Sequence, residues 1–175
     1  EDAQVRSAAE KGVRFLLKIQ NQKGGWGYTK DSQEMDITVS VWALMALRLA
    51  SELGIKECSG ALGRAVRAVR MLTDSKSGKV YYKEFGKFQS ATRYHALTSM
   101  GMFANYILSR CSTPGIVSVQ QDLLLNNVFP IKRDEIIDND LCYAYFGSLA
   151  MYQAGPEPYA RWSGVFRDVI VSSQQ

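Results

Sequence analysis

Apolar residues recur at helical spacing along the whole chain, and two kinds of helix alternate. The first kind is amphipathic: between residues 5 and 19 the apolar positions share one face and charged residues occupy the other. The second kind is apolar on nearly every side, as in ITVSVWALMALRLASEL at 37–53, and this predicts a helix with protein around most of it. Asp36 is placed to cap the start of that helix, and Gly54 is placed to end it.

The same pair of helices then repeats, with a long loop between its two members. Further helices are expected at residues 61–72, 91–108, 116–127, 139–154 and 159–172, the last one after Pro158, which suits a first turn. The loops support the repeat, because QKGGWGY at 22–28 aligns with KSGKVYY at 76–82 after a shift of 54 residues. Self-similarity at this period is typical of stacked supersecondary units. We therefore predict one all-α domain over residues 1–175, with repeats at about 2–54, 59–110, 115–155 and 157–175.

The predicted helices make about three and a half hairpins, which would close a ring only poorly. A helix that is apolar on most sides needs neighbours on most sides. The last amphipathic helix, at 159–172, has no apolar partner after it. We expect the chain to be part of a larger ring, completed by further repeats in the parent chain or by oligomerisation.

A cluster of glycine and aromatic residues follows the first amphipathic segment. Residues 11–26 read KGVRFLLKIQNQKGGW and match the pattern Lys-Gly-x-x-Phe-Leu-x-x-x-Gln-x-x-x-Gly-x-Trp, in which Gln20, Gly24 and Trp26 hold defining positions. This pattern is the QW motif of squalene–hopene and oxidosqualene cyclases, so the chain resembles the prenyltransferase and squalene-oxidase repeat superfamily. The resemblance implies an α/α toroid with buried inner helices and amphipathic outer helices. Residues 138–162 also resemble the closing repeats of bacterial toroid proteins of unassigned function.

The QW motif is expected to be structural. Gln20 would lie at a helix C-terminus, where its amide can serve unpaired backbone groups. Gly24 and Gly25 would let the backbone leave the helix at positive φ. Trp26 would pack over Gln20 and tie neighbouring outer helices together.

The catalytic motifs of the families that the chain resembles are missing from its sequence. There is no Asp-x-Asp-Asp acid, no Asp-Asp-x-x-Asp cluster for an allylic diphosphate and no Cys-Gly-Glu-Gln thioester. A zinc set of Asp, Cys and His is not predicted either, because Cys58 is expected in a loop between repeats. We predict neither a metal nor a cofactor.

Three residues are candidates for acid–base chemistry: Asp36, His95 and Asp140. Asp36, Asp138 and Asp140 precede or begin apolar helices, where aspartate commonly caps free N–H groups. Gathered at one mouth of a ring, they would instead raise the pKa of one another. His95 is the sole histidine, and it is either a core residue or a general acid–base beside Arg93, which would neutralise an anionic ligand.

The candidate ligand-binding residues are Tyr28, Arg93, Tyr94 and Tyr143. Aromatic residues recur on the apolar helices, where they belong either to a core or to a cavity whose π faces stabilise cations. Their bias toward tyrosine favours a partly hydrated central cavity, since buried hydroxyl groups need partners.

Composition narrows the classes of partner. With 46% hydrophobic and 22% charged residues the chain resembles a soluble globular domain, and no apolar run reaches the ~20 residues of a membrane span. The net charge of +4 is scattered and no nucleic-acid motif is present. The three cysteines, Cys58, Cys111 and Cys142, are too few and too widely spaced for a dense disulfide framework. The sequence is therefore compatible with either compartment, the cytoplasm or the periplasm.

Three functional hypotheses follow. The leading one is a non-catalytic binding or scaffold domain that holds an apolar or extended ligand or a protein partner. The second is an enzyme similar to terpenoid cyclases or prenyltransferases, acting on an isoprenoid with a catalytic acid outside these residues. The third is a polysaccharide lyase that uses His95 with Arg93 and Tyr94.

Overall fold

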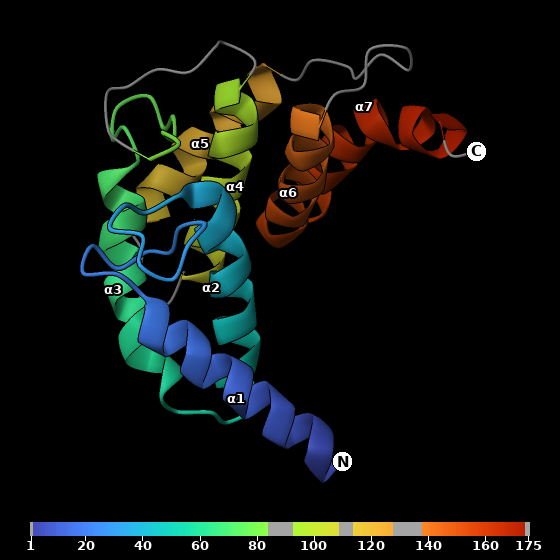
Figure 1. Ribbon diagram of the computed structural model, residues 1–175. Helices are drawn as coiled ribbons and strands as arrows, with labels where there is room; N and C mark the ends of the chain where they lie inside the picture. The colour runs from blue at the N-terminus through green and yellow to red at the C-terminus, as the bar shows by residue number, and fades with distance from the viewer. Residues whose placement is uncertain (1, 84–92, 109–113, 128–137, 174–175) are drawn as a thin grey trace.

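The computed structural model describes residues 2–83, 93–108, 114–127 and 138–173 (Figure 1). These residues form seven helices: α1 (Ala3–Ile19), α2 (Ile37–Glu52), α3 (Cys58–Met71), α4 (Arg93–Ile107), α5 (Pro114–Asn126), α6 (Asp138–Ala154) and α7 (Pro156–Ser173). An isolated antiparallel bridge joins Thr73 to Val80, and the described segments contain no strand. The predicted all-α class is confirmed. None of the described helices is both long and apolar enough to cross a membrane.

The helices pack in two layers. In the first layer α4 lies between α2 and α6 and contacts both. Residues near the starts of these three helices line one pocket, and residues near their ends line another, so the three helices run in the same direction. The other four helices cover this layer: α1 and α3 pack on α2, α5 packs on α4, and α7 packs on α6. The alternation predicted from the apolar pattern is therefore an alternation between layers.

The ends of α2 follow the predicted caps. Asp36 accepts a hydrogen bond from the N–H of Thr38 at 2.9 Å, which caps the N-terminus. At the other end Gly54 has a φ of +88°. Its N–H donates a hydrogen bond to the carbonyl of Ser51, and the N–H of Ile55 donates one to the carbonyl of Ala50. This is a Schellman ending, in which glycine avoids the penalty for a left-handed residue.

Helix α1 departs from the prediction in how much of its apolar face is covered. Val13 is its one buried residue, and Leu16, Leu17 and Ile19 are partly buried against the core. Val5 is exposed, as are the other residues from the start of the helix to residue 9. The periodicity identifies the apolar face correctly, but the covering helices reach only its second half.

Two further boundaries differ from expectation. Cys58 does not lie in a loop between repeats; it begins α3 and is fully buried in the core, where its small side chain packs as an apolar group. Helix α7 begins at Pro156 rather than after Pro158, so both prolines lie in its first turn.

Gln20 ties α1 to α3. Its Nε2 donates hydrogen bonds to the carbonyls of Gly24 at 2.8 Å and Ala61 at 2.9 Å, and its Oε1 accepts one from Arg64 Nε at 2.9 Å. Every polar atom of the amide is therefore used within the junction. These contacts join the end of α1 to the first turns of α3.

The glycines and the tryptophan of the motif complete this junction. Gly24 has a φ of +91°, and a Cβ there would lie 2.5 Å from the carbonyl oxygen of Arg64. Gly25 does not have the predicted positive φ. Glycine is needed there because a Cβ would collide with the side chain of Met35. Trp26 joins α1 to α2, because its indole Nε1 donates to the carbonyl of Leu16 at 2.9 Å and its backbone N–H donates to the hydroxyl of Ser40 on α2 at 2.9 Å.

The second loop repeats this construction 54 residues later. Gly78 also has a positive φ, of +73°, and it packs on α5 as Gly24 packs on α3. Its carbonyl accepts a hydrogen bond from Nε2 of the buried Gln120 at 3.2 Å. The N–H of Val80 donates to the hydroxyl of Thr98 on the following helix at 3.2 Å. In this loop the glutamine comes from α5, the second helix after the loop, instead of from the helix that precedes the loop.

Candidate functional site

A pocket of about 450 Å³ lies between the starts of α2, α4 and α6. Its walls are apolar and come from two neighbouring helices: Val39 and Trp42 of α2, and Ala96, Leu97 and Met100 of α4. Its remaining lining carries hydroxyl and thiol groups: Tyr28, Thr38, Tyr82 and Cys142. The pocket therefore has an apolar interior and polar groups around it.

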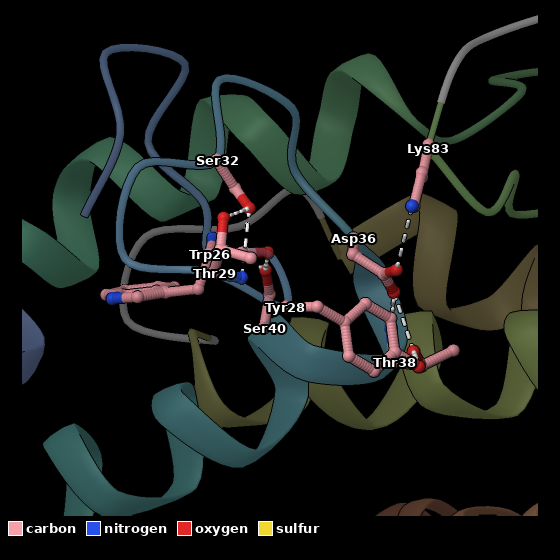
Figure 2. A network of polar contacts seen from close by, with 8 residues as sticks. All are labelled: Trp26, Tyr28, Thr29, Ser32, Asp36, Thr38, Ser40 and Lys83. Carbon is pink, nitrogen blue, oxygen red and sulfur yellow. Dashed lines mark hydrogen bonds and ion pairs between the residues drawn. The ribbon is translucent and has the colours of Figure 1, made fainter. Parts of the chain in front are cut away.

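Asp36 lies beside this pocket and is fully buried. Figure 2 shows its carboxylate between Thr38 and Lys83, with the ring of Tyr28 next to them. Oδ1 accepts hydrogen bonds from the N–H of Thr38 at 2.9 Å and from its hydroxyl at 2.6 Å. Oδ2 faces the ammonium of Lys83 at 3.7 Å. One carboxylate oxygen thus holds the helix start, while the other faces a cation.

Two tyrosine rings flank the same cation. Lys83 Nζ lies 5.0 Å from the ring centroid of Tyr82 and 5.7 Å from that of Tyr28. Burial, followed by polar contacts with Asp36 and Tyr28, raises the pKa of the Tyr82 phenol. The phenol therefore stays protonated over the physiological range and can donate a hydrogen bond.

The loop that carries Tyr28 is held by its own polar contacts. The hydroxyl of Ser32 accepts a hydrogen bond from the N–H of Thr29 at 3.1 Å (Figure 2). Lys23 and Glu34 form an exposed ion pair at 2.6 Å. These contacts close on itself the loop that carries Tyr28.

A smaller pocket of about 290 Å³ lies at the opposite ends of the same three helices. An ion pair between Arg48 and Glu52, with a distance of 3.0 Å, stands at its edge. Between the two pockets the ring of Trp42 stacks on Tyr145 with centroids 5.8 Å apart and meets the ring of Phe146 edge-on at 5.2 Å. Because Trp42 belongs to α2 and both partners belong to α6, these aromatic rings connect α2 directly to α6.

His95 occupies a different place from Asp36. It is 7% exposed, and its ring lies 4.0 Å from that of Tyr94 and 5.8 Å from that of Tyr143. Tyr143 in turn meets Trp162 of α7 at 4.9 Å, so these rings lie between α4, α6 and α7. Burial, followed by the charge of Lys79, lowers the pKa of His95 to about 4. The imidazole is neutral at physiological pH.

The predicted residues therefore fall into separate groups. Tyr28 lines the pocket and Asp36 lies at its rim, whereas Tyr94, His95 and Tyr143 meet on another side of α4. Arg93 and Asp140 lie in the first turns of α4 and α6, and their side chains fall outside the part of the chain that the structure describes. No described group of three histidine, cysteine, aspartate or glutamate side chains is placed to hold a metal ion.

Tyr82 and Lys83 of the site were not predicted, and Trp42 was considered only as one of the aromatic residues on the apolar helices. The repeat contained the signal for Tyr82, because the shift of 54 residues that aligns the two loops places Tyr82 on Tyr28. Trp42 carried only the general signal of an aromatic residue on an apolar helix. For Lys83 the sequence offers no signal, since its role depends on how the second loop returns to the first.

No protein family, curated protein or solved structure matches this chain. The pocket and the polar residues beside it are therefore the features of the chain that bear on its function.

Proposed function

We propose that this chain is a binding domain that holds a small apolar molecule in the pocket between α2, α4 and α6. The apolar interior with polar groups around it supports this function most directly. Its volume of about 450 Å³ falls within the usual range of about 300–1,000 Å³ for small-molecule sites. Such sites are mainly apolar and use a few polar groups to orient the ligand, as Tyr28, Thr38 and Tyr82 would do here.

We also infer that the two layers form an arc of an α/α toroid, as the resemblance to the prenyltransferase and squalene-oxidase repeat superfamily implies. Helices α2, α4 and α6 would be the inner helices and the other four the outer ones. The parallel course of α2, α4 and α6 supports this arrangement, as do the equivalent positions of Gly24 and Gly78. Further repeats or a second copy would complete the ring, with the pocket opening toward its centre.

Binding is favoured over acid–base catalysis because the two best candidates for an acid are engaged elsewhere. Asp36 caps α2 through Oδ1, and His95 lies in the aromatic core beside Tyr143. An enzyme acting on an isoprenoid is the second candidate. The partly exposed rings of Trp42 and Tyr145 favour it, because their π faces could stabilise a cation. Its acid would lie outside the described residues.

Tryptophan fluorescence tests the proposed binding. Trp26 and Trp162 are 1% and 0% exposed, whereas Trp42 is 52% exposed and lines the pocket. Titration with n-octanol or farnesol should therefore shift the emission to shorter wavelength in a saturable way, and Trp42→Phe should abolish the shift. Recovery of farnesol unchanged after incubation supports binding alone, whereas its conversion supports the enzyme.

A variant that fills the pocket provides the control. Ala96→Phe places a ring among the lining residues and should weaken the binding of both probes, while Val171→Phe, at an exposed position of α7, should leave it unchanged. If neither probe gives a saturable shift, or if Ala96→Phe binds as well as the unmodified chain, the proposed function is wrong.

A further inference from the structure

Lys83 places an ammonium group against the rings of Tyr28 and Tyr82, two residues that line the pocket. Its Nζ lies between two tyrosine rings, at 5.0 and 5.7 Å from their centroids, and 3.7 Å from Oδ2 of Asp36. Aromatic faces combined with a carboxylate are the groups that proteins use to bind ammonium ligands. The surroundings of Lys83 Nζ therefore suit an ammonium group whether it comes from this chain or from a ligand.

Asp36 has the capacity to accept a further donor. A fully buried carboxylate is costly unless hydrogen bonds and a counter-charge compensate it. Oδ1 is compensated by two hydrogen bonds from Thr38. Oδ2 has no hydrogen bond of ordinary geometry among the described residues: the phenol of Tyr82 contacts the carboxylate and Lys83 Nζ lies at 3.7 Å, but neither completes a bond to this oxygen. A ligand ammonium that came closer would compensate Oδ2 better than Lys83 does.

Lys83 is free to give up this position. Its side chain is 45% exposed, and ion pairs with an exposed partner contribute little stability because water solvates the released charge. The long methylene stem lets the ammonium move into solvent without a change in the backbone. Displacement of Lys83 by a ligand would therefore cost little.

The same groups connect the ammonium position to the pocket. Tyr28 and Tyr82, which flank Lys83 Nζ, also line the pocket together with Val39 and Trp42. A molecule with its cationic end at Asp36 can place an attached apolar chain between α2 and α4. Such a molecule would use the carboxylate and the apolar walls at once.

We propose that Tyr28, Tyr82 and Asp36 form an ammonium-binding site beside the pocket, and that the ligand is an amine with an apolar chain. In the free chain Lys83 fills this site, and the amine displaces it. This inference rests on the proposed binding function and deepens it by assigning the ligand class. An anionic head group is disfavoured because Asp36 would repel it from Lys83.

Three probes with the same chain length and different head groups test this assignment: n-octylamine, n-octanol and octanoate, each followed through Trp42 fluorescence. The amine should bind at least about tenfold more tightly than the alcohol, because charge-assisted hydrogen bonds are the stronger ones. Lys83→Ala should raise the preference for the amine over the alcohol by about twofold to fivefold, because it removes a cation that competes for the site and is held there by exposed cation–π contacts. Lys56→Ala, at an exposed position between α2 and α3, should leave this preference unchanged.

Asp36→Asn distinguishes charge from structure. Asparagine still caps a helix, so the fold should persist, and alcohol binding reports whether it does. The preference for the amine over the alcohol should disappear in this variant. Tyr82→Leu should weaken amine binding by about twofold to fivefold through loss of one ring face.

The outcomes separate the two proposals. If all three probes bind the unmodified chain equally well, the pocket binds apolar molecules but the ammonium site is wrong. If octanoate binds most tightly and Lys83→Ala abolishes its binding, Lys83 is an anion receptor and the assignment is overturned. If none of the probes binds, the proposed binding function itself fails.

Discussion

Replacement of Gly24 by alanine tests the packing of the first loop on α3, and Gly54 provides a matched control. The two glycines have nearly the same φ, +91° and +88°. An alanine at either position meets the same backbone penalty of about 1–2 kcal/mol, partly offset by about 0.4–1 kcal/mol from the less flexible unfolded chain. The difference between the two variants therefore isolates what surrounds the new Cβ.

The two positions differ in the space available to a new Cβ, which is open at Gly54 and occupied at Gly24. At Gly54 a Cβ meets nothing within 4 Å, so Gly54→Ala should lower the free energy of unfolding by about 0.5–1 kcal/mol. At Gly24 the Cβ would lie 2.5 Å from the carbonyl oxygen of Arg64, which belongs to a helix backbone and cannot rotate away. Forced contacts of this kind cost about 1–3 kcal/mol, so Gly24→Ala should cost about 2–4 kcal/mol in total.

Urea unfolding followed by far-UV circular dichroism measures both variants. Gly78→Ala should fall between them, because the nearest atoms to its Cβ lie at 3.0–3.3 Å and the closest belongs to the side chain of Val119. Equal losses for Gly24→Ala and Gly54→Ala would refute the close approach of the loop to α3, and with it the junction built around Gln20.

Other predictions concern the junctions and the buried histidine. Gln20→Ala removes three hydrogen bonds of a partly exposed junction and should lower the free energy of unfolding by about 1–2 kcal/mol in urea titrations. Gly147→Ala would bring a Cβ within 2.0 Å of the Trp162 ring, so the free energy of unfolding measured by thermal unfolding should fall by about 2 kcal/mol or more. Gly63→Ala, whose Cβ would meet nothing within 4 Å, should instead raise it by up to about 1 kcal/mol through higher helix propensity. Because the folded pKa of His95, about 4, lies below its ordinary 6.5, its contribution to stability is complete above pH 6.5 and is lost as the pH falls toward 4. Urea midpoints compared at pH 7 and pH 4.5 should show a smaller loss for His95→Gln than for the unmodified chain.

The sequence predicted the helices well because their periodicity is strong and their ends carry clear signals. Asp36 and Gly54 bound α2 as expected, through a side-chain cap and a positive φ. The extent of burial was harder to predict. An amphipathic pattern identifies which face of α1 is apolar, but Val5 is exposed because burial also depends on how far the neighbouring helices reach. A glycine in a loop is similarly ambiguous: Gly25 makes room for Met35 instead of bending the chain.

The candidate site was predicted only in part. Tyr28 and Asp36 were named from their places before α2, and Tyr82 follows from the repeat once the loops are aligned. The sequence did not show that His95 faces α6 while Asp36 faces the second loop, because the surroundings of each residue depend on how its helix packs against the others. The ammonium of Lys83 enters the site through tertiary contacts that no local pattern encodes.

Chemical labelling of Cys142 tests the occupation of the pocket most directly. Cys142 is partly buried and lines the pocket, whereas Cys58 is fully buried in α3 and serves as the unreactive reference. The rate of alkylation by N-ethylmaleimide is measured at each cysteine by peptide mass spectrometry, with and without n-octylamine or n-octanol. A ligand between α2, α4 and α6 should slow labelling of Cys142 in proportion to the occupancy found from Trp42 fluorescence. Labelling of Cys142 at an unchanged rate while the fluorescence saturates would place the ligand elsewhere and contradict the account.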